Sequence, residues 1–252
     1  MVLCNVGIIK KSFAALAVIV LALFSSCQHT NEKRAVVNGS LADASGIKLI
    51  LQEMDPRAIR AVDSVVPDHT GNFRFNLVVG EPGFWLLKAA TGKIMVLLLD
   101  EGDHIELSGS ARDFPDNVIM KGTEEAMILN AFFKQTRLFE TAVDSLEMLL
   151  VLHQDSSDYY HFTQITDNAF RQILEIQRRN EIEFISRHPF SLGSLVVLNY
   201  AFGANPVLDP VEDFIYYHQL DSTLMEKFPE NKHVRFHHQR VEEIKRSMSA
   251  GR

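Results

Sequence analysis

Between residues 34 and 122, apolar and polar residues form short runs that are separated by turn residues. Phe73–Leu77 alternates apolar and polar positions with the two-residue period of a strand that has one buried face. Pro67–Asn72, just before it, has the composition of a hairpin loop. Similar runs predict strands at Ile47–Glu53, Ala61–Val66, Gly83–Lys88, Ile94–Leu99, His104–Leu107 and Val118–Lys121. Strands at this spacing predict an antiparallel β-sandwich or an open barrel.

After Gly122 the apolar period changes from two to about 3.6 residues, so we place a domain boundary there. Thr123 is a predicted N-cap, and acidic Glu124 and Glu125 suit the first turn of a helix that ends near His153. Its expected buried stripe is Leu129, Phe132, Phe133, Phe139, Val143, Leu146 and Leu150. Further helices are predicted at Ser157–Arg187, Leu192–Tyr200, Val211–Leu220, Ser222–Phe228 and Lys232–Met248.

On the predicted Ser157–Arg187 helix, the buried candidates are Phe162, Ile165, Ala169, Ile173, Ile176, Ile182 and Ile185. The sequence as a whole therefore predicts an α+β protein. Residues 34–122 are expected to form the β-sandwich or open barrel, and residues 123–252 an all-α helical domain.

The first 27 residues are organised like a bacterial lipoprotein signal. Lys10 and Lys11 precede the apolar run Phe13–Phe24, which fits a signal-peptide core and is short for a membrane-spanning helix of about twenty residues. Two serines and Cys27 follow. We expect cleavage before Cys27, acylation of its sulfur with fatty acids such as palmitate, and a polar tether over residues 28–33. A buried core helix or an uncleaved anchor is the alternative.

A lipid anchor on Cys27 would place the mature chain at the membrane of the bacterial cell envelope. Gln28 is not the aspartate that retains lipoproteins at the inner membrane in some bacteria, which favours the outer membrane, facing the periplasm. Residues 1–27 hold two lysines and no acid, so the net formal charge changes from −7 to about −9 when they are removed. This acidic balance argues against nucleic-acid binding and against electrostatic docking on anionic lipid.

Cysteine usage restricts the chemistry of the mature chain. Cys4 and Cys27 are the only cysteines in the sequence. The first is expected to leave with the signal peptide, and the second to be consumed by the lipid. No thiol would remain for a cysteine nucleophile, a disulfide or a Cys-x-x-Cys pair.

The order of these parts is itself informative. The signal that ends at Cys27 comes first, and turn and strand motifs of the β-rich unit follow: Asp63–Val65, Asp68, Gly71–Phe73, Pro82–Phe84 and Leu98–Leu107. One motif, His188–Ser191, lies in the helical segment. This arrangement resembles the front part of thioredoxin-like bacterial lipoproteins of the thiol–disulfide interchange type. The resemblance implies a front β domain of unknown function, a helical region and then a thioredoxin domain with a Cys-x-x-Cys pair. This sequence ends at Arg252, about where that domain would begin, so no redox residue carries over.

Two clusters have the composition of metal ligands. His233, His237 and His238 include positions four residues apart, a helical spacing that can hold zinc, and a third ligand would come from Glu242, from Glu243 or from elsewhere in the chain. We favour the alternative that these histidines occupy a solvated C-terminal helix end, where the negative end of the helix dipole favours protonated side chains. The turn Asp100-Glu101-Gly102-Asp103 brings three carboxylates together, but it lacks the ligand spacing of a calcium loop, so we expect an acidic hairpin turn.

The sequence evidence for catalytic residues is weaker than that for metal ligands. Glu181 and Glu183 are two residues apart on a helix and point in different directions, so we expect a solvated face rather than an acid–base pair. Ser64 and Ser191 lack a nucleophile-elbow sequence. The larger aromatic residues could stack on sugar rings, but we expect most of them in the core: Phe84, Trp85, Phe190, Tyr200, Phe202, Tyr216 and Tyr217. We assign no catalytic, cofactor-binding or metal-binding residue and expect no cofactor.

The sequence thus predicts a noncatalytic, lipid-anchored envelope protein that acts as an interaction or ligand-binding module. Its ligand site is expected in the groove between the sandwich and the helices. The alternative is an accessory or truncated partner of a thioredoxin-like thiol–disulfide oxidoreductase that works in trans. Glycan binding through exposed aromatic residues is a third hypothesis.

Overall fold

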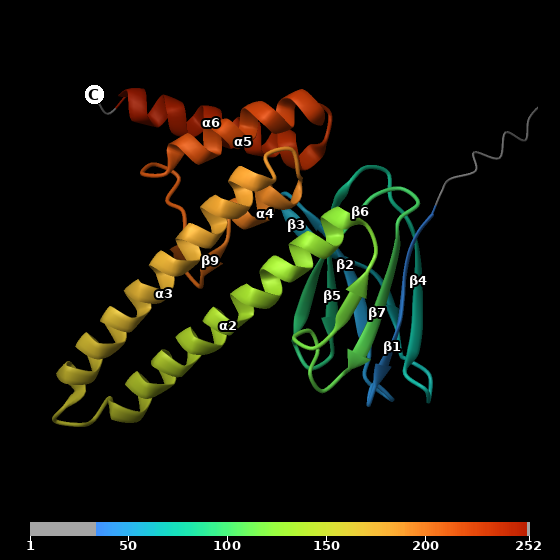
Figure 1. Cartoon of the computed structure of the whole chain (residues 1–252), viewed down its shortest axis with the longest axis horizontal. Coiled ribbons are helices and arrows are strands. Elements are labelled where there is room, and N and C mark those ends of the chain that lie inside the picture. Colours follow the sequence, from blue (N-terminus) through green and yellow to red (C-terminus); the bar gives the residue numbers. More distant parts are fainter. Residues whose placement is uncertain (1–33, 251–252) are drawn as a thin grey trace, which may run out of the picture. The chain divides into compact units, whose positions relative to one another are not determined.

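A β-rich part of two four-stranded sheets is followed by helices, in the order that the sequence predicts for β and α elements (Figure 1). The computed structural model describes residues 34–250, which belong to one compact unit. The α+β class is confirmed, and the two sheets form a sandwich that is not closed into a barrel. The predicted signal peptide, Cys27 and the tether lie outside the described residues.

The first sheet has the strand order β4-β1-β7-β8 and corrects two predictions. β1 was absent from the expected strands because its sequence is rich in small residues, yet it lies between β4 and β7. β1 also pairs in parallel with β7, so the sandwich is not purely antiparallel. The four strands of the second sheet come between β1 and β7 in the sequence, and this segment provides the long crossover connection that a parallel pair needs. The strands are β1 (Arg34–Ala42), β4 (Asn72–Val78), β7 (His104–Ser110) and β8 (Ile119–Lys121).

The second sheet is antiparallel, with the order β3-β2-β5-β6, and its two inner strands meet apolar groups on both faces. Trp85 on β5 packs in the core between the two sheets, whereas its neighbour Phe84 packs in the core that the helices form. On β6, Leu97 likewise packs in the core between the two sheets, and Leu98 packs in the core that the helices form. β3, at the edge, is exposed along almost its whole length. The strands are β2 (Leu49–Asp55), β3 (Ala58–Val65), β5 (Gly83–Ala89) and β6 (Ile94–Leu99).

Five helices follow, together with one small two-stranded hairpin. Thr123 caps the first helix as predicted, because its hydroxyl accepts a hydrogen bond from the backbone N–H of Ala126 at 3.4 Å. The two helices expected over residues 211–228 are one helix, α5. Figure 1 shows α2 and α3 side by side as an antiparallel pair. The bounds are α2 (Glu124–His153), α3 (Tyr159–Arg187), α4 (Gly193–Leu198), β9 (Ala201–Phe202), β10 (Asn205–Pro206), α5 (Phe214–Lys227) and α6 (Lys232–Ala250).

The predicted stripe of α2 is confirmed at its beginning, and the predicted stripe of α3 is only partly right. Leu129, Phe132, Phe133 and Val143 are buried on α2. Of the residues expected to be buried on α3, Ile185 is buried, and Ile173 and Ile182 are partly buried and pack against the hydrophobic cores. Phe162 and Ala169 are also partly buried, whereas Ile165 and Ile176 are exposed. Instead, α3 buries Thr166, Gln177, Glu181, Phe184 and Ile185. Within residues 34–250, no helix has the length and apolar character needed to cross a membrane.

Gly39 allows β1 to lie close to its neighbours in the first sheet. A Cβ atom at this position would lie 2.3 Å from the carbonyl oxygen of Leu107 and 2.9 Å from the ring of Phe73. Because the nearest atom belongs to the backbone of the paired strand, neither side can move away cheaply. We therefore predict that Gly39→Ala lowers the free energy of unfolding by about 1–3 kcal/mol, measured by urea denaturation.

Gly80→Ala is the matched control for this change. A Cβ atom at Gly80 would have no heavy atom within 4 Å. Equal stabilities for the two variants would contradict the close approach of β1 to β7.

Candidate functional site

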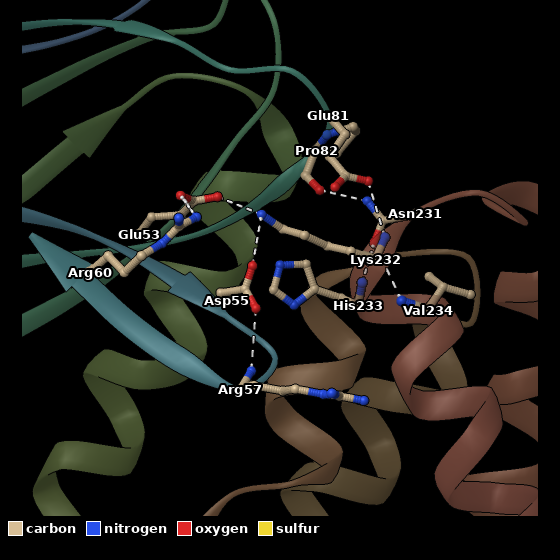
Figure 2. Close-up of polar contacts among 10 residues, drawn as sticks. All are labelled: Glu53, Asp55, Arg57, Arg60, Glu81, Pro82, Asn231, Lys232, His233 and Val234. Atoms are coloured by element: carbon tan, nitrogen blue, oxygen red, sulfur yellow. Dashed lines mark hydrogen bonds and ion pairs between the residues drawn. The ribbon is translucent and has the colours of Figure 1, made fainter. Parts of the chain in front are cut away.

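The beginning of α6 is hydrogen-bonded to the loop between β4 and β5 (Figure 2). Asn231 caps the helix, since its Oδ1 accepts hydrogen bonds from the backbone N–H groups of His233 at 3.0 Å and Val234 at 3.4 Å. The Nδ2 of Asn231 donates to the carbonyl oxygen of Pro82 at 2.7 Å, and the backbone N–H of Lys232 donates to Glu81 at 3.1 Å. The capping interactions therefore also join the helix to the sandwich.

The side chain of Lys232 adds an ionic contact to β2. Its Nζ lies 2.5 Å from Oε1 of Glu53 and 3.6 Å from Oδ2 of Asp55 (Figure 2). Glu53 also pairs with Arg60 of β3 at 2.9 Å. Burial lowers the pKa of Lys232, but the hydrogen bond and charge of Glu53 outweigh burial, so the pKa is raised overall. Lys232 therefore stays charged at neutral pH and joins the beginning of α6 to the end of β2.

His233 follows directly and is buried at this junction. Its ring packs edge-on against Phe84, with 4.8 Å between the ring centroids. Burial and the charge of Lys232 lower the pKa of His233 to about 4, so the imidazole is neutral at pH 7. Its Nε2 is buried and has no hydrogen-bond partner among the described residues.

A hollow that we call the junction cavity lies between the second sheet and helices α4 and α6. Its volume is about 310 Å³. Its walls carry six apolar and five polar side chains: Met54, Pro56, Phe84, Leu195, Val196 and Phe236, with Asp55, Asn199, His233, His237 and Arg240. Phe84 and His233 also line a second hollow of about 510 Å³, beside β3 and the loop between β4 and β5. A cavity is therefore present at the junction where the sequence predicts a ligand site.

The histidines of α6 do not form a metal site. Nε2 of His237 donates to the carbonyl oxygen of Tyr217 at 3.1 Å, and Nδ1 of His238 lies 3.0 Å from Oδ2 of Asp221. Among residues 34–250, no group of three or more side chains of the metal-ligating types is placed to hold an ion. Glu242 pairs with Lys245 at 3.5 Å, and Glu243 is exposed.

The favoured interpretation of this cluster, a solvated helix end, is wrong for two of the three histidines. His233 and His237 lie in the first two turns of α6 and are 8% and 4% exposed. Burial lowers the pKa of His237 as well as that of His233. Both imidazoles pack against the outer face of the second sheet or α5, because α6 presents this side to the core.

Glu181 is the second correction, because it is fully buried rather than solvated. The amide Nε2 of Gln177 donates to Oε1 of Glu181 at 3.1 Å and to the hydroxyl of Thr136 on α2 at 3.2 Å. Burial raises the pKa of Glu181 to about 9, so the carboxyl group is protonated at pH 7. Gln177, Glu181 and Ile185 are spaced by four residues, and this spacing is the sequence signal that indicates a shared buried face. Glu183 is exposed and pairs with Arg187 at 2.6 Å.

The remaining candidates lie apart from the junction cavity or in the core. The acidic turn is present, and the N–H of Asp100 donates to Asp103 at 2.9 Å, but it is not a hairpin, because it connects β6 of the second sheet to β7 of the first. Ser64 lies on the exposed edge strand, and the hydroxyl of Ser191 accepts from the backbone N–H of Gly193 at 3.1 Å. Most of the aromatic residues belong to the core, as expected: Phe84, Trp85, Phe202 and Tyr217 are buried, Tyr200 and Tyr216 are partly buried, and Phe190 is 45% exposed.

Comparisons with known proteins give little information about this chain. No protein family matches it, and a search among curated proteins gives no match. One solved structure, described as an NMR structure of the protein from Eubacterium rectale, aligns with 37% of this chain and 92% of its own length, at 5% identity and a TM-score of 0.23. A likeness of this size carries no argument about fold or function. The resemblance to thioredoxin-like lipoproteins stays a prediction.

The buried carboxyl group of Glu181 gives a prediction about pH. The folded pKa is about 9 against 4.5 for an ordinary glutamate, so between these values the folded chain holds a proton that the unfolded chain has lost. Stability therefore falls as pH rises through this window, by at most about 1.4 kcal/mol per pH unit. We predict that Glu181→Gln becomes progressively more stable, relative to the unchanged chain, from pH 5 to pH 8 in urea denaturation.

Glu183→Gln on the exposed side of the same helix provides the control and should show no such trend. The other titrating groups are shared by the proteins compared and cancel in the difference. Parallel pH profiles for Glu181→Gln and the unchanged chain would contradict burial of a protonated Glu181.

Proposed function

We propose that the mature chain is a noncatalytic, lipid-anchored protein of the bacterial envelope that binds a small ligand in the junction cavity. The observation that carries this proposal is the cavity itself, whose walls come from both parts of the fold. Phe84 of β5 faces it from the sheet, and Leu195 of α4 and Phe236 of α6 face it from the helices. Apolar walls with a few polar groups are typical of small-molecule sites, and such sites favour junctions of this kind.

The rigidity of the junction supports this proposal. The hydrogen bond from Asn231 to Pro82 and the ion pair of Lys232 with Glu53 both join α6 to the sandwich beside the cavity. The two sides of the cavity are therefore held together by contacts that need no ligand. A preformed site loses less conformational entropy on binding than one that must close around its ligand.

The location rests on the N-terminal signal. We propose that Cys27 is acylated and holds the chain at the envelope, on the periplasmic side of the outer membrane. The accessory role in thiol–disulfide exchange stays a prediction, since no contact among the described residues favours it over ligand binding.

The anchor predicts the mass and the location of the protein made in a bacterial host. We expect the chain in the membrane fraction, beginning at Cys27 and carrying fatty acyl groups in intact-mass spectrometry. Cys27→Ser should retain its first 26 residues and carry no acyl group. A soluble, unacylated product with those residues still attached would contradict the lipoprotein assignment.

If the junction cavity binds a ligand, the ε-methyl group of Met54 in its wall should detect the binding. Met54 lines the junction cavity, whereas Met95 is buried between the two sheets. We expect that at least one of benzoate, benzamide and benzamidine, at millimolar concentration, shifts the Met54 ε-methyl resonance saturably and leaves that of Met95 unchanged. The measurement is methyl NMR of the purified full chain in lipid nanodiscs, with Met54→Leu for assignment.

Val196→Phe, which adds bulk to the wall of the cavity, should abolish these shifts. Val62→Phe makes the same change on the exposed strand β3, beside the second hollow, and should leave them unchanged. No saturable shift of Met54 with any of the three compounds would exclude ligand binding in the junction cavity.

A further inference from the structure

Arg240 contributes a guanidinium group to the junction cavity that has no carboxylate partner among residues 34–250. Its Nη1 donates to the neutral amide oxygen of Asn199 at 2.5 Å, and its Cζ lies 5.8 Å from the centre of the Tyr217 ring. By contrast, Arg137 on α2 pairs with Asp116 at 2.7 Å. The guanidinium of Arg240 has five N–H donors, and a single amide oxygen satisfies few of them.

The other ionisable groups of the cavity leave this positive charge uncompensated. Asp55 is the one acidic side chain in its wall, and its Oδ2 already lies 3.6 Å from the ammonium group of Lys232. Burial lowers the pKa of both His233 and His237, so these imidazoles are neutral at pH 7. Among residues 34–250, a ligand in the cavity therefore meets one cation without a carboxylate partner, Arg240, beside two neutral rings and the carboxylate of Asp55, which Lys232 already pairs.

The rest of the wall is apolar and partly aromatic. Phe84 from the sheet and Phe236 from α6 supply two rings, and Phe236 is 37% exposed although it is a large apolar side chain. Leu195 and Met54 complete the apolar surface. These groups suit a ring or a short alkyl chain, and the volume of about 310 Å³ is at the lower end of the range for ligand sites.

The geometry points to a small organic anion as the ligand: a carboxylate bound by Arg240, carried on an apolar or aromatic body that packs between Phe84 and Phe236. The planar fork of a guanidinium matches the two oxygens of a carboxylate, which makes arginine the preferred partner for this group. This inference rests on the proposed function, because it names the ligand class of the same cavity.

Three compounds that share an aromatic ring but differ in charge test this inference on the full chain in nanodiscs. Benzoate, benzamide and benzamidine share a ring and differ in charge, and the Met54 methyl resonance reports each affinity. We expect benzoate to bind about tenfold more tightly than benzamide, and benzamidine to bind more weakly than both. Arg240→Gln should weaken benzoate about tenfold or more and leave benzamide within about twofold.

Arg235→Gln is the matched control, since Arg235 lies on the same helix, is mostly exposed and pairs with Glu230 at 3.6 Å. It should leave all three affinities unchanged. Benzamide binding also verifies that the cavity of Arg240→Gln is intact. If that variant does not fold, the order of the three affinities in the unchanged chain still decides the question.

The outcomes separate the two proposals. Equal affinities for benzoate and benzamide, or benzoate binding that survives Arg240→Gln, would overturn the anion preference while leaving the ligand site in place. Absence of binding by all three compounds would overturn the ligand site itself.

Discussion

The fold depends on the burial of the second sheet on both faces. Alternate side chains of β5 and β6 point into two different cores, so that Trp85 and Leu97 stabilise the sandwich while Phe84 and Leu98 bind the helices. Burial of apolar area on both faces contributes at roughly 25 cal/mol per Å², and neither core is complete without this sheet. The sandwich and the helices therefore share one structural element, and the junction cavity lies on the helical side of it.

Polar contacts at the same junction determine how α6 is placed. Lys232 and Glu53 lie at a site where their side chains are 29% and 21% exposed, so the free energy of desolvation offsets part of their attraction. Their contribution is thus better understood as orientation than as net stability. Asn231 acts in the same sense, since one side chain both caps α6 and bonds to Pro82. Together they fix the helix that carries His233, Phe236 and Arg240.

Local periodicity predicted most of the elements, and tertiary pairing explains the exceptions. Alternation found β4 because Phe73, Phe75 and Leu77 are large and apolar. It missed β1, whose alternate positions are mainly small, because the position of that strand is set by its partners β4 and β7. The junction was foreseeable as a place to look for a cavity, and Phe84, His233 and His237 in its wall were candidates for other roles. The exposure of Glu181, His233 and His237 depends on which helices and strands pack against them, and the candidate lists gave no role to Arg240.

The buried ionisable groups of the helical part follow a common physical rule. Glu181 is protonated and His233 and His237 are neutral at pH 7, because burial penalises the charged form of each. The two neutral imidazoles do not attract or repel a charged ligand at long range. Asp55 in the same wall is charged, but its carboxylate already lies 3.6 Å from the ammonium group of Lys232, so a charge preference of the junction cavity must come from a further group that keeps its charge. Arginine is such a group, since its pKa is too high for burial to remove its proton. The recognition of charge in this cavity is thereby concentrated on Arg240, whose donors are held in place by Asn199 and the ring of Tyr217.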